Sequence, residues 1–393
     1  MPWRETNVDE QRMQFVAVAR QPGMTMTAAC ERFGISRPTG YRWLGKWAQS
    51  ETFATLREDS RRPRRSPHRT PAAATASVVA LRQQYGWAGR KLRPLLRAAG
   101  VTLSTATIDR IIRREGLVDP AASHRPAPTR FERAAPNELW QMDFKGQYPL
   151  RDQTWCFPLS VLDDHSRFAV GLFALSGTEG APVAAVLRQC FERYGLPVAM
   201  LVDHGCPWWS TSNGHGLTTF TVGLIEQGIT LAYSGVRHPQ TQGKVERFHR
   251  TLGERLRRWG VPQDFSAFPA ALDRFRTEYN EVRPHEATQL RPPATQYTPS
   301  PRVYQTVPPR WDYPSGLDVR RVDHAGCLSI DGRRYFVCQA LATRWVACHA
   351  LGQRRLVQYR HLYVRDLNLA TGRTTPILAR QRPPVPSDLQ RMS

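Results

Sequence analysis

The chain has 393 residues, enough for two to four domains, and 41% of them are apolar, enough to form packed cores. Basic residues exceed acidic ones by 22, and a surplus of this size attracts polyanions, nucleic acid first among them. No apolar run is long enough to cross a bilayer, and the N-terminus lacks the apolar core of a signal peptide. This composition excludes a disordered chain, and we expect a cytoplasmic protein with no membrane partner.

The seven cysteines are scattered along the chain, and no two of them form a CxxC pair. In a cytosolic chain such cysteines are typically reduced and buried. We therefore expect neither disulfides nor a structural zinc site.

Residues 1–56 carry the pattern of a helix-turn-helix DNA-binding domain. A short helical stretch is followed by Gly34, which permits a sharp turn, and by Ser36, which can cap the next helix. This second helix should contact DNA through Arg37, Arg42 and Lys46. A plain three-helix bundle with a solvated basic face would show the same pattern, but the charge of the whole chain favours DNA binding.

A linker rich in Arg, Pro and Ser is predicted at 57–75, and a second helix-turn-helix-like domain at 76–119. In this domain leucines and then isoleucines recur at helical spacing. Its last helix would expose three further candidates for DNA contacts, Arg110, Arg113 and Arg114. Two such units in tandem favour a bipartite DNA reader. A Pro-rich linker at 120–136 follows.

Residues 137–298 have an α/β pattern, in which three successive strands and then strand–helix alternation predict a mixed sheet flanked by helices. The helices are expected near 181–194, 217–227 and 242–259. After a Pro-rich break, short strands with Gly and Asp-Gly turns predict a small basic β-barrel at 315–372. We expect the Arg- and Pro-rich residues 373–393 to form a disordered tail.

Three carboxylates in the α/β region stand at positions where chemistry is possible. In LWQMDFK, period-two alternation puts Asp143 on the strand face opposite the apolar residues. Asp203 ends the apolar run VAMLV, at the end of a strand where sites gather in α/β sheets. Glu246 lies off the apolar stripe of its helix. Each alone has an ordinary explanation: an exposed sheet residue, a turn former and a Glu–Arg surface pair.

Basic and aromatic residues surround two of these carboxylates. The candidates for phosphate contacts beside Glu246 are His238, Lys244, Arg247 and Arg250, with a solvated basic face as the alternative. Trp208 and Trp209 follow Asp203, and for them packing is favoured over stacking on an unpaired base.

The motifs ELWQMDFKG, VLDDHSRFAVG, RYGLPVAMLVDHGCPW and HPQTQGKVERFHRTL share their order and approximate spacing with a known catalytic core. The chain resembles the bacterial insertion-sequence transposases of the DDE and retroviral-integrase superfamily. The resemblance implies a ribonuclease-H-like core with Asp143, Asp203 and Glu246 as catalytic, metal-binding residues. One departure is His204, where the family usually has Asn. Asp163 and Asp164 in VLDDHSR correspond to a structural turn of the family.

The resemblance also implies an activity and its cofactor. Two Mg²⁺ ions, for which Mn²⁺ can substitute, would activate a water and stabilise the leaving oxygen. The enzyme would be a polynucleotidyl transferase that frees a 3′-hydroxyl at a transposon end and joins it to target DNA. Its partners would be double-stranded DNA, namely terminal inverted repeats and target, and further copies of itself in a dimer or larger assembly. The alternatives are a related nuclease or resolvase that does not join strands and a non-catalytic DNA-binding regulator.

Overall fold

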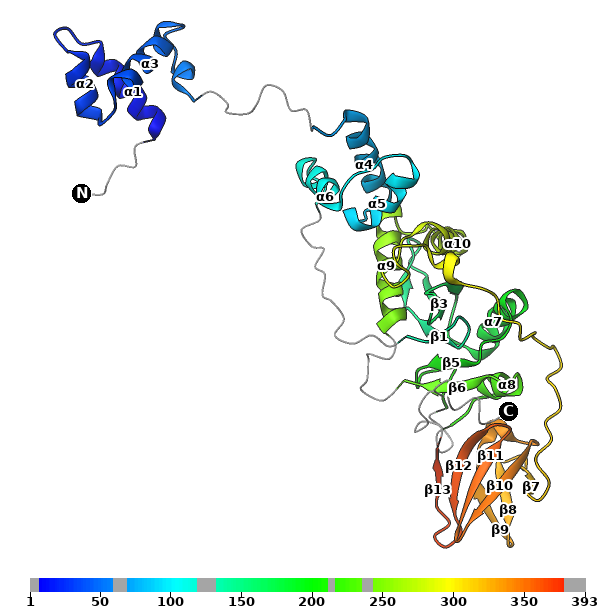
Figure 1. The fold of residues 1–393 in the computed structure, drawn as a ribbon. Coiled ribbons are helices and arrows are strands. Elements are labelled where there is room, and N and C mark those ends of the chain that lie inside the picture. The colour runs from blue at the N-terminus through cyan, green and yellow to red at the C-terminus, as the bar shows by residue number, and fades with distance from the viewer. Residues whose placement is uncertain (1–6, 59–68, 119–131, 211–215, 235–242, 378–393) are drawn as a thin grey trace. The chain divides into compact units, whose positions relative to one another are not determined.

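The computed structural model describes residues 7–58, 69–118, 132–210, 216–234 and 243–377, and it divides into two compact units, Met1–Pro71 and Ala72–Ser393 (Figure 1). The first unit consists of short helices around one core of buried residues. Its elements are α1 (Val8–Ala19), α2 (Met26–Phe33), α3 (Arg37–Ala48) and the 3₁₀ helix η1 (Phe53–Leu56). In none of the described helices do length and apolarity suffice for a membrane span.

The predicted helix-turn-helix is formed by α2 and α3. Gly34 ends α2 in the left-handed conformation, with φ of 62°, which a residue without Cβ adopts at no steric cost. Ser36 takes the N-cap position of α3, but its hydroxyl hydrogen-bonds the Thr39 hydroxyl at 2.9 Å rather than a backbone N–H. Phe15, Cys30 and Trp43 are buried between the helices.

The second unit begins with three helices, α4 (Ala72–Tyr85), α5 (Gly89–Ala98) and α6 (Thr105–Arg114). The predicted helical spacing is confirmed, because the spaced leucines and isoleucines form one buried cluster that includes Leu92, Leu96, Ile108 and Ile112. The Ser104 hydroxyl caps α6 by accepting a hydrogen bond from the Thr107 N–H at 3.1 Å.

A mixed sheet follows, as predicted. It consists of β1 (Leu139–Phe144), β2 (Tyr148–Pro149), β3 (Trp155–Asp163), β4 (Ala169–Leu175), β5 (Ala199–Val202) and β6 (Thr230–Tyr233). β3 pairs antiparallel with β1, β2 and β4, whereas β1, β5 and β6 run parallel to one another in that order. This is the ribonuclease-H-like arrangement expected for the central core.

Helices cover both faces of this sheet. α7 (Gly180–Tyr194) and α8 (Thr219–Glu226) share a core with Trp140 and Met142 of β1. α9 (Gly243–Trp259) and α10 (Phe268–Thr277) share another core with Leu162 of β3 and Leu172 of β4. A short π-helix, η3 (Glu278–Val282), continues α10. Successive β1 residues point to opposite faces, so Asp143 points to the side of α9.

The C-terminal strands form an open sheet, and the predicted closed barrel is not confirmed. The described strands are β7 (Asp318–Arg321), β8 (Cys327–Ile330), β9 (Arg333–Phe336), β10 (Trp345–Leu351), β11 (Arg354–Tyr359), β12 (Leu362–Asn368) and β13 (Thr374–Pro376). Five of them pair in the order β13–β12–β11–β10–β7. β8 and β9 pair only with each other among the described strands, through a tight turn in which Asp331 and Gly332 have positive φ. This hairpin therefore does not connect β7 to β13, and the sheet stays open.

The disordered tail was predicted to begin at residue 373, but Thr374–Pro376 form strand β13 and pair with β12. Residues 378–393 lie outside the described residues.

The open sheet packs on the central core through α8. The Glu226 carboxylate accepts hydrogen bonds from Arg344 Nε at 2.8 Å and from the Tyr359 hydroxyl at 2.7 Å.

Candidate active site

Asp143 lies near the end of β1, where its side chain is 20% exposed. Burial, and after it the charges of Asp203 and Glu246, raise the pKa of this carboxyl to about 7. Coulomb interactions fall off with distance, so both carboxylates belong to the surroundings of Asp143. Asp203 and Glu246, which follow Asp143 by 60 and 103 residues in the sequence, therefore both act electrostatically on its carboxyl.

The pairing of β1 with β5 brings two of these carboxylates together. Gln141 of β1 is in register with Leu201 of β5, and the strands are parallel. Asp143 and Asp203 each come two residues later, so they lie at the same end of adjacent strands. The Asp203 carboxylate accepts a hydrogen bond from the Gly205 N–H at 2.8 Å, which fixes the turn after β5.

Glu246 lies in the first turn of α9 and is exposed. Within the part of the chain that the structure describes, no three His, Cys, Asp or Glu side chains stand close enough together to hold a metal ion. The three carboxylates are thus neighbours rather than an assembled ligand set, and their role in metal binding stays a prediction. Their chemistry suits the prediction, since Mg²⁺ prefers hard oxygen ligands, and the raised pKa of Asp143 reflects its burial and the nearby negative charges of Asp203 and Glu246.

Two residues near Asp143, His249 and Lys145, were not predicted from the sequence to belong to the site. His249 Nδ1 lies 3.8 Å from Asp143 Oδ2, and its Nε2 is 2.9 Å from the Ser160 hydroxyl. Burial, and then the charge of Lys145, lower the pKa of His249 to about 4, so the ring is neutral at pH 7. His249 follows Glu246 by three residues, and helical spacing could have placed both on neighbouring positions of one face.

Lys145 extends from the end of β1 to α9. A Cβ built on Gly253 would lie 3.7 Å from the Lys145 ammonium, an ordinary van der Waals distance, so the Lys145 side chain lies against α9 at Gly253. Burial and then the nearby Arg257 lower the pKa of Lys145. A cation therefore lies on the same face of the sheet as Asp143.

The loop after Asp203 is packed rather than open. Trp208 and Trp209 are 1% and 8% exposed, which confirms the prediction that these rings pack inside the protein. The His204 ring lies 5.0 Å from the Trp209 ring and 5.3 Å from the Tyr233 ring. Its buried Nε2 has no hydrogen-bond partner among the described residues. Burial lowers the pKa of His204.

The acidic pair Asp163 and Asp164 is fully buried. Asp163 accepts hydrogen bonds from the N–H groups of Asn137 at 2.8 Å and Ser166 at 2.7 Å. Asp164 forms an ion pair with Lys244. Both carboxylates thus make hydrogen bonds or an ion pair inside the protein, as predicted for a structural turn.

The basic candidates fall into three groups, on α3, α6 and α9. Most of them are exposed: Arg37, Arg42, Arg110, Arg113, Arg114, Arg247 and Arg250. Lys46 is half-buried and donates a hydrogen bond to the Arg57 carbonyl at 3.3 Å. Lys244 is 17% exposed because of its ion pair with Asp164. His238 lies outside the described residues.

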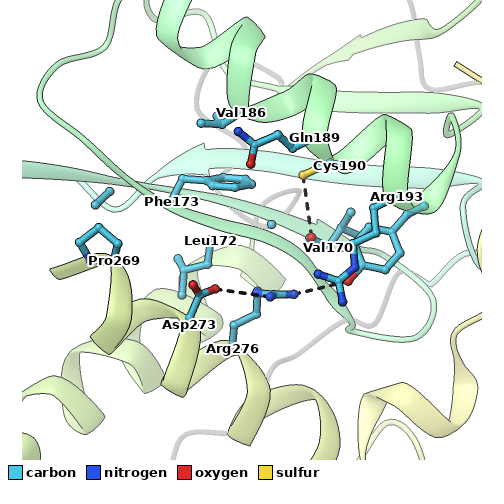
Figure 2. Close-up of a pocket in the computed structure, with 13 residues that line it drawn as sticks. Val170, Leu172, Phe173, Val186, Gln189, Cys190, Arg193, Pro269, Asp273 and Arg276 are labelled. Atoms are coloured by element: carbon cyan, nitrogen blue, oxygen red, sulfur yellow. Dashed lines mark hydrogen bonds and ion pairs between the residues drawn. The ribbon is translucent and has the colours of Figure 1, made fainter. Parts of the chain in front are cut away.

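A cavity of about 370 Å³ lies along β4, between α7 and α10 (Figure 2). Arg276 crosses it and approaches Asp273 Oδ1 and the Tyr194 hydroxyl, each at 3.4 Å. None of the candidate carboxylates lines this cavity. It is therefore separate from the candidate active site.

Models of known families match most of the described chain. Residues 133–239 and 227–293 match two models of the integrase core domain. Residues 6–56 and 39–112 match two models of homeodomain-like domains.

Two similar proteins come from bacterial insertion elements. The uncharacterized 31.7 kDa protein of insertion element IS407 from Burkholderia multivorans is 25% identical over 234 residues, covering 57% of this chain and 79% of that protein. The uncharacterized 39.2 kDa protein of insertion element IS476 from Xanthomonas euvesicatoria is 29% identical over 262 residues, covering 62% and 70%. Among solved structures, the HTLV-2 integrase catalytic core domain in complex with magnesium is 15% identical, with a TM-score of 0.33, over 42% of this chain and 97% of that one.

The sheet, its flanking helices and the family matches define a protein with an integrase core domain preceded by helix-turn-helix domains. Within this class, the core matches and the insertion-element relatives support an insertion-sequence DDE transposase.

Proposed function

We propose that the chain is a DNA transposase that cleaves the ends of its mobile element and joins the freed 3′-hydroxyl to target DNA. Its substrates are double-stranded terminal inverted repeats and target DNA. The observation that supports this proposal is that Asp143 and Asp203 lie at the same end of the adjacent strands β1 and β5, and that the charge of Glu246 also acts on the Asp143 carboxyl. A protein has little reason to gather uncompensated carboxylates unless a cation or a proton joins them.

Asp143, Asp203 and Glu246 would hold the divalent ions. When bound, two Mg²⁺ or Mn²⁺ ions supply a nucleophilic oxygen and stabilise charge on the leaving oxygen. Adjacent strands position Asp143 and Asp203, whereas Glu246 is exposed on the first turn of α9. Side-chain rotation at Glu246 would complete the ligand set when ions and DNA bind, since the repulsion among the three carboxylates then ends.

The exposed arginines would hold the DNA. Arg37 and Arg42 on α3 and the three arginines of α6 suit phosphates and base edges of the terminal repeat. Arg247 and Arg250 follow Glu246 on α9, where they would contact phosphates near the reacting bond. The surplus of 22 positive charges supports a large electrostatic share of this binding.

The test is a strand-joining assay with labelled end DNA, purified full-length chain and Mg²⁺. One substrate carries the uncut end and another the pre-cut end. The proposal expects cleavage of the first and joining of the second, both lost in the Asp143→Asn variant. Cleavage without joining would support the related nuclease or resolvase, and binding without either reaction would support the non-catalytic regulator.

Joining two ends to one target requires both ends in one complex. We therefore expect a dimer or larger assembly of this chain when end DNA is bound. Light scattering of the DNA complex measures its mass, and a complex with one chain and two ends would contradict the expectation.

A further inference from the structure

We propose that Lys244 is a positioning residue for Glu246, acting through its ion pair with the buried carboxylate of Asp164. The inference rests on the proposed function, and it gives Lys244 a role other than the DNA contact expected from the sequence. The Lys244 ammonium lies 2.6 Å from Asp164 Oδ1 and 3.2 Å from the Asp164 carbonyl oxygen. The Asp164 side chain is 0% exposed.

The Asp164 carboxylate is a junction between three parts of the core. Its Oδ2 accepts a hydrogen bond from the Arg133 N–H at 2.9 Å, and its Oδ1 accepts one from Gln141 Nε2 at 2.7 Å. The Asp164 N–H donates to the Leu139 carbonyl at 2.9 Å. Leu139 and Gln141 belong to β1, the strand that carries Asp143. The junction therefore connects the strand of one candidate ligand with the helix of another.

A buried carboxylate without a cation is costly, so the ion pair holds Lys244 firmly to Asp164. Lys244 precedes Glu246 by two residues in the first turn of α9. Residues two apart on a helix do not face each other, so Lys244 does not act on Glu246 by contact. It fixes how the first helical turn is rotated over β1, and thereby the direction in which Glu246 extends.

The experiment measures Mn²⁺ affinity of the full-length chain by calorimetric titration and end-DNA affinity by gel shift. In the Lys244→Met variant we expect Mn²⁺ affinity to fall by about 10- to 100-fold, as for other residues that orient metal ligands, with DNA affinity unchanged. Lys244→Met in a Glu246→Gln background should cause no further loss, because its effect passes through Glu246. Arg258→Met removes a positive charge from an exposed position in the last turn of the same helix and should leave Mn²⁺ affinity unchanged.

Lys244→Met leaves Asp164 buried without its cation and can impair folding. The double variant Lys244→Met/Asp164→Asn removes the unpaired charge as well, and we expect it to fold and to bind Mn²⁺ as weakly as the single variant. Wild-type Mn²⁺ affinity in either folded variant would overturn the inference, as would a loss of DNA affinity alone. If the wild-type chain itself binds no Mn²⁺ and cleaves no end, the proposed function fails instead.

Discussion

Replacement of Asp143 by Asn should stabilise the metal-free protein at alkaline pH. The pKa of this carboxyl is about 7 in the folded chain instead of its ordinary 3.8. The folded state therefore binds more protons than the unfolded state between these values, and stability falls as the pH rises from about 4 to about 7. Above pH 7 the ionised carboxylate keeps the folded chain at its lower stability. Asn cannot ionise and avoids this loss.

The pKa difference corresponds to about 4 kcal/mol at about 1.4 kcal/mol per pH unit. The Asp143 side chain is 20% exposed, and solvent screens part of the repulsion. We therefore expect the variant to gain about 2 kcal/mol at pH 8.5, with the gain vanishing near pH 4. Asn is close to Asp in shape, so packing around β1 should not change.

Hydrogen–deuterium exchange of peptides from β1 and β5, in the presence of a chelator, measures the local free energy of opening. An Asp331→Asn variant is the control, because Asp331 is exposed in a turn of the C-terminal hairpin. Added Mn²⁺ should reverse the order by stabilising the wild-type chain more than the variant. If Asp143→Asn were no more stable than the wild-type chain at pH 8.5 without metal, the electrostatic account of the site would be refuted.

Three further substitutions separate catalysis, DNA binding and packing. Glu246→Gln should lower the rate of end cleavage by at least about 100-fold and leave end-DNA affinity unchanged, because losing a metal ligand costs more activity than losing a residue that only orients a ligand. A cleavage rate within tenfold of wild type would contradict this. Arg113→Ala should reduce the slope of log affinity against log salt by about 1, and an unchanged slope in fluorescence anisotropy would remove Arg113 from the interface. Trp208→Ala should destabilise the core by about 3–5 kcal/mol in urea unfolding, because this ring is buried between Phe144 and Phe220. Unchanged stability with weakened DNA binding would instead favour stacking on a base.

Periodic patterns in the sequence were sufficient to predict most of the core. Alternation in LWQMDFK placed Met142 and Asp143 on opposite faces of a strand, and the structure buries Met142 in the core shared with α7. The apolar stripe of α9 likewise predicted the burial of Phe248 and Leu252. Such patterns are local, because one face of each element must leave water. They therefore show which side of an element is buried, and not which element covers it.

Contacts between distant segments could not be predicted in this way. Lys244 and Asp164 are 80 residues apart, and nothing near either residue indicates the other. The sequence therefore predicts phosphate contacts for Lys244, as for its exposed neighbours Arg247 and Arg250. The prediction of a closed C-terminal barrel failed for a related reason. Short strands and turns predict hairpins, but closure of a barrel depends on whether β7 pairs with β13. That pairing has no signature in the turns themselves.

The central claim is that Asp143, Asp203 and Glu246 together bind a pair of divalent ions. Electron paramagnetic resonance of the full-length chain with Mn²⁺ and a pre-cut DNA end measures this most directly. Two ions about 3.5–4 Å apart couple magnetically, so we predict a coupled signal from two Mn²⁺ per active site that disappears in Asp143→Asn. A signal from isolated Mn²⁺ only, or a coupled signal that persists in this variant, would contradict the claim.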